Sequence, residues 1–163
     1  MNKKQIILTK ERIKNTINRI AFSIIEDYHT ETCITIIGFD KNGYIIAKNL
    51  KKIITNENNI KTFIHKIKKD KENHFTITPP LKSDNMKNVF LVDDVLKSGR
   101  TIIYGIKEIL TYNIDSLKTI ILVNRNHNLF PIGVDYVGLN LSTTLKDHIT
   151  VVMKEGEEIA YLT

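Results

Sequence analysis

The sequence has few residues that could cross-link the chain or anchor it in a membrane. It contains one cysteine, Cys33, which excludes a disulfide framework and predicts a reducing compartment such as the cytoplasm. No apolar stretch approaches the length of a membrane span. The first residues, MNKKQIILTK, lack the long apolar stretch and small-residue cleavage site of a signal peptide. Histidine and cysteine do not cluster as zinc ligands do.

What the sequence does contain fits one globular domain over residues 1–163, long enough to bury a core of its own. The formal net charge is +6, which favours an anionic partner, either a nucleic acid or a phosphorylated metabolite. Lysine is spread along the whole chain, so charge alone leaves both partners open.

Hydrophobic periodicity predicts strands that alternate with helices. Apolar residues spaced by three and four predict helices over 9–28, 44–54 and 99–112, the last with Ile103, Ile106 and Leu110 on one face. Short apolar runs predict strands over 33–39, 59–69, 74–78, 88–95, 117–124, 135–141 and 148–154. Pro79 and Pro80 predict a connector after the third strand, because proline cannot continue a ladder.

This order favours an α/β fold: a single doubly wound parallel sheet flanked by helices, with a small β hood or hairpin. Its crossovers should be right-handed. Residues 57–87 are expected to form a flexible hairpin and connector within the domain.

The most informative stretch is VFLVDDVLKSGRT, from Val89 to Thr101. In open α/β sheets, ligands bind beyond the carboxyl ends of the strands, where Asp93 and Asp94 are predicted. The turn that follows contains Gly99 and leads into a helix, and the N–H groups of such a turn bind anions. Carboxylates for hydroxyl groups and amides for a phosphate together indicate a sugar phosphate. The Gly-Lys-Ser/Thr order of a Walker loop is missing.

Val89–Thr101 resembles the phosphoribosyl pyrophosphate (PRPP) signature of type I phosphoribosyltransferases. The segments RIAFSIIE, LVDDVLKSGRTI and LVNRNHNLFPIGVDYVGLN are similar to one subfamily, the pyrimidine-operon regulators with uracil phosphoribosyltransferase activity (PyrR). The resemblance spans most of the chain and is weakest at 57–87.

The resemblance implies transfer of ribose 5-phosphate from PRPP to a nucleobase, with uracil favoured to give UMP, and release of pyrophosphate. It implies catalytic roles for Asp93, Asp94 and Arg125. The implied PRPP-binding residues are Asp93, Asp94, Val95, Lys97, Ser98, Gly99, Arg100 and Thr101. Three alternatives stay open: an RNA-binding pyrimidine-operon attenuator, a purine phosphoribosyltransferase, and a non-catalytic nucleotide-binding relative.

Other parts of the implied site depart from the family. The pyrophosphate loop would consist of Phe39, Asp40, Lys41, Asn42 and Gly43. In it, Asp40 stands where relatives have lysine, and Asn42 where they have arginine. Lys69 and Asp70 would stand in for an Arg-Asp pair in the lid that closes over PRPP. The implied base-binding residues are His127, Val134 and Tyr136.

The resemblance also implies partners. Mg²⁺ would accompany PRPP without a protein cage, since Mg²⁺ keeps waters and uses substrate oxygens. A homodimer or a higher homo-oligomer is expected. Arg19 matches a basic position of the relatives' RNA-binding face, but Phe22 stands where they have histidine, and Asn128 where they have arginine. Specific RNA binding is therefore not expected.

Overall fold

The structure is a computed structural model that describes residues 4–72, 74–82, 86–142, 148–154 and 156–163. Its centre is a six-stranded sheet with the strand order β4-β3-β2-β5-β6-β7. The parallel strands are β2 (Cys33–Phe39), β3 (Lys61–Lys69), β5 (Asn88–Leu96), β6 (Ser116–Asn124) and β7 (Tyr136–Asn140). At one edge, β4 (Phe75–Thr78) returns antiparallel to β3, as a hairpin requires.

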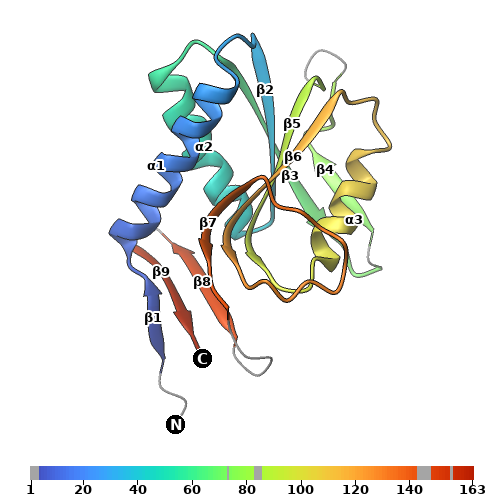
Figure 1. Ribbon diagram of the computed structural model, residues 1–163. Helices are drawn as coiled ribbons and strands as arrows, with labels where there is room; N and C mark the ends of the chain where they lie inside the picture. Colours follow the sequence, from blue (N-terminus) through green and yellow to red (C-terminus); the bar gives the residue numbers. More distant parts are fainter. Residues whose placement is uncertain (1–3, 73, 83–85, 143–147, 155) are drawn as a thin grey trace.

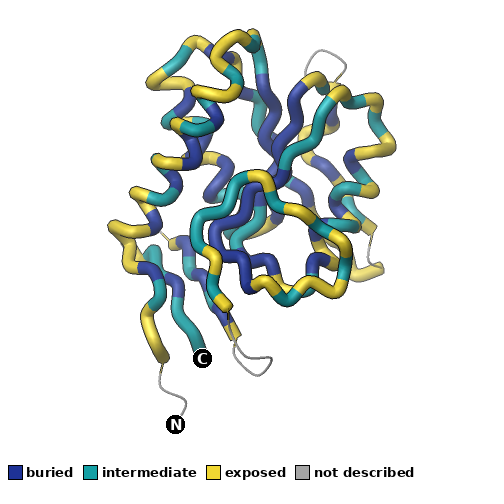
Figure 2. Tube along the Cα trace, viewed as in Figure 1, coloured by how far each residue is buried: buried dark blue, intermediate teal, exposed yellow. Residues whose placement is uncertain are grey.

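Helices cover both faces of this sheet (Figure 1). The helices α1 (Lys10–Asp27) and α2 (Asn42–Glu57) lie on one face, and α3 (Arg100–Ile109) lies on the other. Two separate apolar cores result, one under α1 and α2 and one under α3. The central strands β2, β5 and β6 are buried along most of their length (Figure 2). The predicted doubly wound α/β fold is confirmed.

A second, smaller sheet forms the β hood that the sequence predicted. It consists of β1 (Gln5–Leu8), β8 (Ile149–Lys154) and β9 (Glu157–Leu162), in the order β1-β9-β8. All its pairings are antiparallel, with Ile6 opposite Tyr161. Val151 and Met153 of β8 join the core under α1 and α2. The hood, at the lower left of Figure 1, therefore packs against the same face as those helices.

The prediction of which residues of α3 face the core was wrong by one position. Ile102 and Ile109 are buried, whereas Leu110 is 60% exposed. Gly105 sets this rotation: a Cβ at this position would collide with the ring of Phe39, so the helix packs with its glycine against that ring. The helix begins at Arg100 because Gly99, at φ 83°, is in the left-handed region and ends the preceding turn.

The pH dependence of stability should report on His65, a buried residue of β3. Its Nδ1 lies 2.6 Å from the carbonyl oxygen of Pro79, and the side chain is shielded from water. Burial lowers the pKa of the His65 imidazole, and the hydrogen bond to Pro79 offsets only part of this. The unfolded chain therefore binds more protons as the pH falls through about 6.5, and the fold loses stability below that pH.

We expect the free energy of unfolding to fall by at most about 1.4 kcal/mol per pH unit below pH 6.5 on account of His65. Denaturant titrations at pH 7.5, 6.5 and 5.5 measure this. In His65→Asn the slope should be smaller, because asparagine does not titrate. The matched control is the exposed His29, whose replacement by asparagine should leave the slope unchanged. Equal slopes for the wild type and His65→Asn would contradict the assignment.

No helix among the described residues is long and apolar enough to cross a membrane.

Candidate active site

Two adjacent carboxylates lie near the carboxyl end of β5. Asp93 still pairs with β6, opposite Ile121, so the strand carries these acids rather than ending before them. Asp93 Oδ1 accepts a hydrogen bond from the Asp94 N–H (2.9 Å), and Asp94 Oδ1 accepts one from the Val95 N–H (2.8 Å). Burial, and next the neighbouring Asp94 carboxylate, raise the pKa of Asp93 well above its usual range. The acid pair, Asp93 and Asp94, therefore resists carrying two full charges unless a positive group arrives.

The loop of residues 97–101, which the sequence predicts to bind phosphate and which is called the phosphate loop below, follows directly. The Ser98 hydroxyl accepts a hydrogen bond from the Arg100 N–H (3.3 Å), and α3 begins there. The first N–H groups of a helix have no partner within it and attract anions. A cavity of about 260 Å³ joins the acid pair to this loop. Its lining residues are Asp93, Asp94, Val95, Leu96, Lys97, Ser98, Gly99, Thr101 and Ile102.

Of the residues predicted to bind PRPP, only Arg100 does not line this cavity. Its guanidinium lies over the ring of Phe130, 5.5 Å from the ring centroid. Phe130 belongs to the loop after β6, whose backbone holds the phosphate loop: the N–H groups of Leu129 and Phe130 donate to the Ser98 carbonyl at 2.9 and 3.2 Å. The Arg100 side chain thus connects the phosphate loop to the loop after β6, and its backbone N–H belongs to the first residue of α3.

The predicted catalytic Arg125 starts the same loop after β6. It is 7% exposed, its N–H donates to the Leu96 carbonyl (3.2 Å), and it is not among the residues that line the cavity. Asn124 is also buried. Its amide donates to the side chains of Asn126 (2.8 Å) and Asn140 (3.0 Å). Asn124 therefore organises the loop through these hydrogen bonds.

The loop between β2 and α2 packs tightly against the acid pair. A Cβ on Gly43 would lie 2.5 Å from the Val92 carbonyl oxygen and 3.2 Å from the Asp93 Cα. The first turn of α2 therefore touches β5 backbone to backbone. The amide of Asn42, in this turn, donates to Asp94 Oδ2 (2.7 Å) and to the carbonyl of Val151 in the hood (2.9 Å).

The other predicted members of that loop have different surroundings. Phe39 points into the core under α3, where its ring contacts Phe75 edge-on. Asp40 forms an ion pair with Lys66 of β3 (3.4 Å), and the Lys66 ammonium also lies 4.8 Å from the ring centroid of Tyr44. Sequence reasoning missed Lys66, because only the pairing of Gly38 with Lys66 across β2 and β3 brings it here.

The predicted lid residues lie at the end of the β3–β4 hairpin. Lys69 is the last residue of β3 and is exposed. The Asp70 carboxylate accepts hydrogen bonds from the N–H groups of Glu72 (2.8 Å) and His74 (2.9 Å). These bonds, first that from His74, lower the pKa of Asp70. Asp70 therefore shapes the turn. This turn lies at the carboxyl end of β3, on the same side of the sheet as the acid pair, because β3 runs parallel to β2 and β5.

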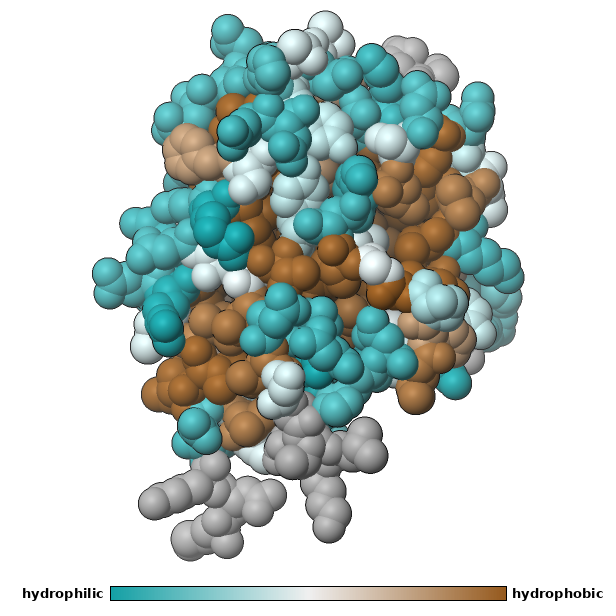
Figure 3. Space-filling model, in the orientation of Figure 1, coloured by the Kyte–Doolittle hydropathy of each residue, from teal (hydrophilic) through white to brown (hydrophobic). Residues whose placement is uncertain are grey.

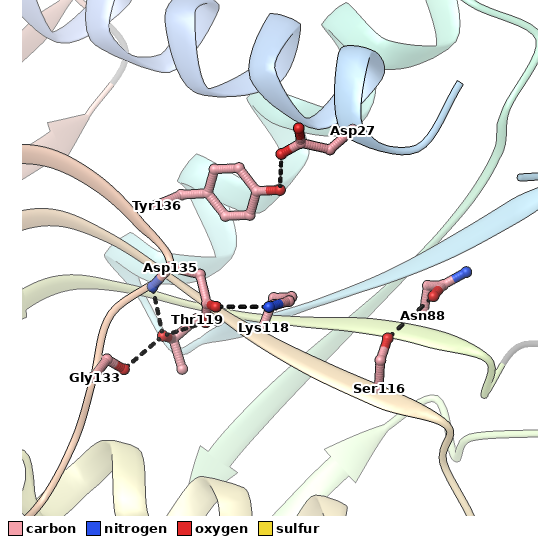
Figure 4. A network of polar contacts seen from close by, with 8 residues as sticks. All are labelled: Asp27, Asn88, Ser116, Lys118, Thr119, Gly133, Asp135 and Tyr136. Carbon is pink, nitrogen blue, oxygen red and sulfur yellow. Dashed lines mark hydrogen bonds and ion pairs between the residues drawn. The ribbon is translucent and has the colours of Figure 1, made fainter. Parts of the chain in front are cut away.

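The predicted base residues have different surroundings. Val134 packs against the core under α3, and His127 is half-buried in the loop after β6. The Tyr136 hydroxyl donates to Asp27 (2.6 Å), next to an ion pair of Lys118 with Asp135 (Figure 4). Burial, and next the Asp27 carboxylate, raise the pKa of Tyr136. Tyr136 lines a different cavity from the acid pair.

Comparison with known proteins agrees with this geometry. Residues 4–156 match the phosphoribosyl transferase domain. The chain is 30% identical to the bifunctional protein PyrR of Clostridium novyi, over 95% of this chain and 93% of the relative. It is also 30% identical to that of Fusobacterium nucleatum, over 98% of each chain. For Bacillus subtilis PyrR the identity is 27%, over 97% of this chain and 94% of the relative.

Solved structures show the same fold. The hypoxanthine phosphoribosyltransferase of Trypanosoma cruzi aligns with a TM-score of 0.73 at 22% identity, covering 84% of this chain and 81% of that one. A hypoxanthine-guanine phosphoribosyltransferase of Bacillus anthracis aligns with a TM-score of 0.71 at 20% identity, covering 86% and 84%. The domain match over residues 4–156 and the PyrR relatives at 30% identity show that the chain belongs to the type I phosphoribosyltransferase family.

Proposed function

We propose that this phosphoribosyltransferase transfers ribose 5-phosphate from PRPP to uracil. The observation that carries the proposal is the shared cavity of about 260 Å³, which is lined both by two carboxylates and by the turn that leads into α3. The carboxylates suit ribose hydroxyls, and the N–H groups of the turn suit the 5′-phosphate. The choice of uracil is supported by the PyrR relatives; the purine-specific structures resemble this chain in fold alone.

The chemistry assigned to the acid pair is electrostatic. The bond from ribose C1′ to pyrophosphate breaks, the bond from C1′ to a base nitrogen forms, and that nitrogen loses its proton. Positive charge develops on the ribose between these events, and preorganised carboxylates stabilise it. The raised pKa of Asp93 means that a negative charge on Asp93 is costly beside Asp94, so a positive charge that develops on the ribose is especially favourable there.

Mg²⁺ is proposed as part of the substrate. The described residues contain no group of three side chains placed to hold a metal. The carboxylate oxygens of Asp93 and Asp94 are the ligand type that Mg²⁺ prefers, and they fit an ion held mainly by PRPP oxygens. Such an ion would neutralise charge on the departing pyrophosphate.

Pyrophosphate is proposed to meet the β2–α2 loop, through Lys41 and the N-terminus of α2. Asp40 by itself would repel an anion. Its ion pair with Lys66 offsets that charge, which supports pyrophosphate binding despite the unusual loop. Catalytic help from Arg125, closure by Lys69 and Asp70, and base contacts from His127 and Val134 remain predictions.

The test is pyrophosphate release from PRPP and Mg²⁺ with uracil, hypoxanthine, guanine or adenine supplied in turn. Release with uracil alone is the expected result. Release with a purine alone would move the assignment to purine salvage. No release with any base, but measurable UMP binding, would favour a non-catalytic nucleotide-binding protein.

Sequence-specific RNA binding is not part of the proposal. The Arg19 guanidinium, at the one matched basic position on α1, donates to the carbonyls of Val137 (3.0 Å) and Gly138 (2.9 Å) in β7. It therefore stabilises the fold, and Phe22 beside it is exposed without charge. Phosphate contacts dominate the affinity of proteins for nucleic acids, and several expected ones are absent from the sequence.

We expect equal and weak binding to a structured hairpin RNA and to a scrambled RNA of the same length. Filter binding at 50 and 200 mM salt measures this, because purely electrostatic binding weakens similarly for both RNAs. Tight binding that distinguishes the two sequences would contradict the prediction and favour an operon regulator.

A homodimer is also proposed, because apolar surface gathers in several places. Figure 3 shows it over the hood at the lower left and toward the right of this face. Ile6 of β1 is 57% exposed and Leu129 is 82% exposed. Sedimentation of the purified protein decides between monomer and dimer.

A further inference from the structure

Asn42 forms the contact that joins three separate elements. It is the first residue of α2, and its amide reaches Asp94 in β5 (2.7 Å) and the carbonyl of Val151 in β8 (2.9 Å). The Val151 carbonyl can only accept hydrogen bonds, and the Asp94 carboxylate, when it is ionised, can also only accept them. The amide nitrogen must therefore face them, which fixes the orientation of this side chain.

The two N–H groups of the Asn42 amide are thus both used inside the protein. What the side chain has left is its carbonyl oxygen, which repels a pyrophosphate anion. A role as pyrophosphate ligand, expected from its place in the loop, does not fit this geometry. A role toward Asp94 does fit, because the hydrogen bond is short and joins a neutral donor to a carboxylate.

The Val151 carbonyl, which accepts one of these hydrogen bonds, is held in place by the hood. Val151 is buried in the core under α1 and α2, so its carbonyl has a fixed position. On the side of Asp94, Gly43 allows the same helical turn to pack directly against the backbone of β5. Asp94 Oδ1 is held by the Val95 N–H, and Asn42 holds the remaining oxygen, Oδ2. The carboxylate is therefore fixed at both oxygens.

We propose that Asn42 is a positioning residue, which holds the Asp94 carboxylate in the phosphoribosyl site and ties it to hood strand β8. The inference rests on the proposed function, since Asp94 is taken to face the ribose. It assigns to the hood a part in catalysis: β8 supplies no side chain to the cavity, yet its backbone sets the place of the carboxylate that does.

Kinetics of three variants test this. Asn42→Ala should lower kcat about tenfold and change the KM for PRPP less than about threefold, because a misplaced carboxylate loses stabilisation that exists only in the transition state. Asn42→Asp has the same shape but sets a third carboxylate against two acceptors, so kcat should fall about a hundredfold. Asn49→Ala, an exposed asparagine on the same helix, should match the wild type.

A direct ligand role would give a different pattern, with a raised KM for PRPP as the main effect in Asn42→Ala. A contact that only stabilises the fold would lower the melting temperature and leave kcat unchanged. Either pattern overturns the inference.

A second readout does not depend on turnover. The side-chain amide of Asn42 gives a pair of ¹H–¹⁵N resonances, assigned by their absence in Asn42→Ala or, should that variant not fold, in Asn42→Ser. Asp94→Asn should shift this pair, and Asp115→Asn, at an exposed turn, should not. A pair that ignores Asp94→Asn overturns the inference. If the wild type transfers ribose phosphate to no base, the proposed function fails, and these resonances still decide whether Asn42 holds Asp94.

Discussion

Asp94→Asn should lower kcat for phosphoribosyl transfer by about a hundredfold to a thousandfold, the usual effect of removing one preorganised electrostatic group. The variant loses the negative charge that is proposed to face the ribose. It also disturbs its surroundings, because the Asp94 carboxylate accepts hydrogen bonds at both oxygens, from the Val95 N–H and the Asn42 amide. An asparagine has a single acceptor oxygen, so one of these donors would face another donor.

Steady-state kinetics with saturating PRPP and Mg²⁺ measure this effect. Asp115→Asn makes the same chemical change at an exposed turn residue, and its kcat should equal that of the wild type. A kcat for Asp94→Asn within about threefold of the wild type would remove the acid pair from the mechanism, because even a weak electrostatic contribution exceeds that.

Gly43→Ala should damage both stability and catalysis. Its methyl group would lie 2.5 Å from the Val92 carbonyl oxygen, a backbone atom inside the sheet that cannot move aside easily. The first turn of α2 would have to shift, and Asn42 would shift with it. We expect the free energy of unfolding to fall by about 1–3 kcal/mol, as overpacking of a tight contact does. We also expect kcat/KM to fall at least about tenfold.

Urea denaturation and steady-state kinetics measure the two effects. Gly133→Ala is the matched control, since a Cβ there meets no heavy atom within 4 Å. Its free energy of unfolding should stay within about 0.5 kcal/mol of the wild type. A Gly43→Ala protein of unchanged stability would mean that α2 does not rest on β5 as described.

The sequence predicted most of what depends on local pattern. The run CITIIGF gave a strand with the bounds that the structure shows, Cys33–Phe39, because a β-branched run between polar residues allows little else. The adjacent acids and the glycine turn line one cavity, and their closeness in the sequence is enough to bring them together. Both features lie within thirteen consecutive residues, from Val89 to Thr101.

Features that depend on contacts between distant residues escaped the sequence. The strand β1 has only four residues, too few for any period to appear, and it exists because β9 pairs with it. The inner face of α3 depends on where Phe39 meets Gly105. Lys66 reaches Asp40 through sheet register alone. Tyr136 was predicted beside the base, yet its hydroxyl binds Asp27, at the end of a helix more than a hundred residues earlier.

The hood has a consequence for how the protein is made. Its middle strand, β9, follows β1 and β8 in the chain, and neither of them has a partner in that sheet before it exists. On the ribosome, the six-stranded sheet and its helices can therefore form while β1 waits for residues 157–162. The carbonyl of Val151 is in turn placed against Asn42 only when that sheet closes. The nascent chain thus acquires the loop at 97–101 early and the final support of its acid pair late, only after β9 has been synthesised.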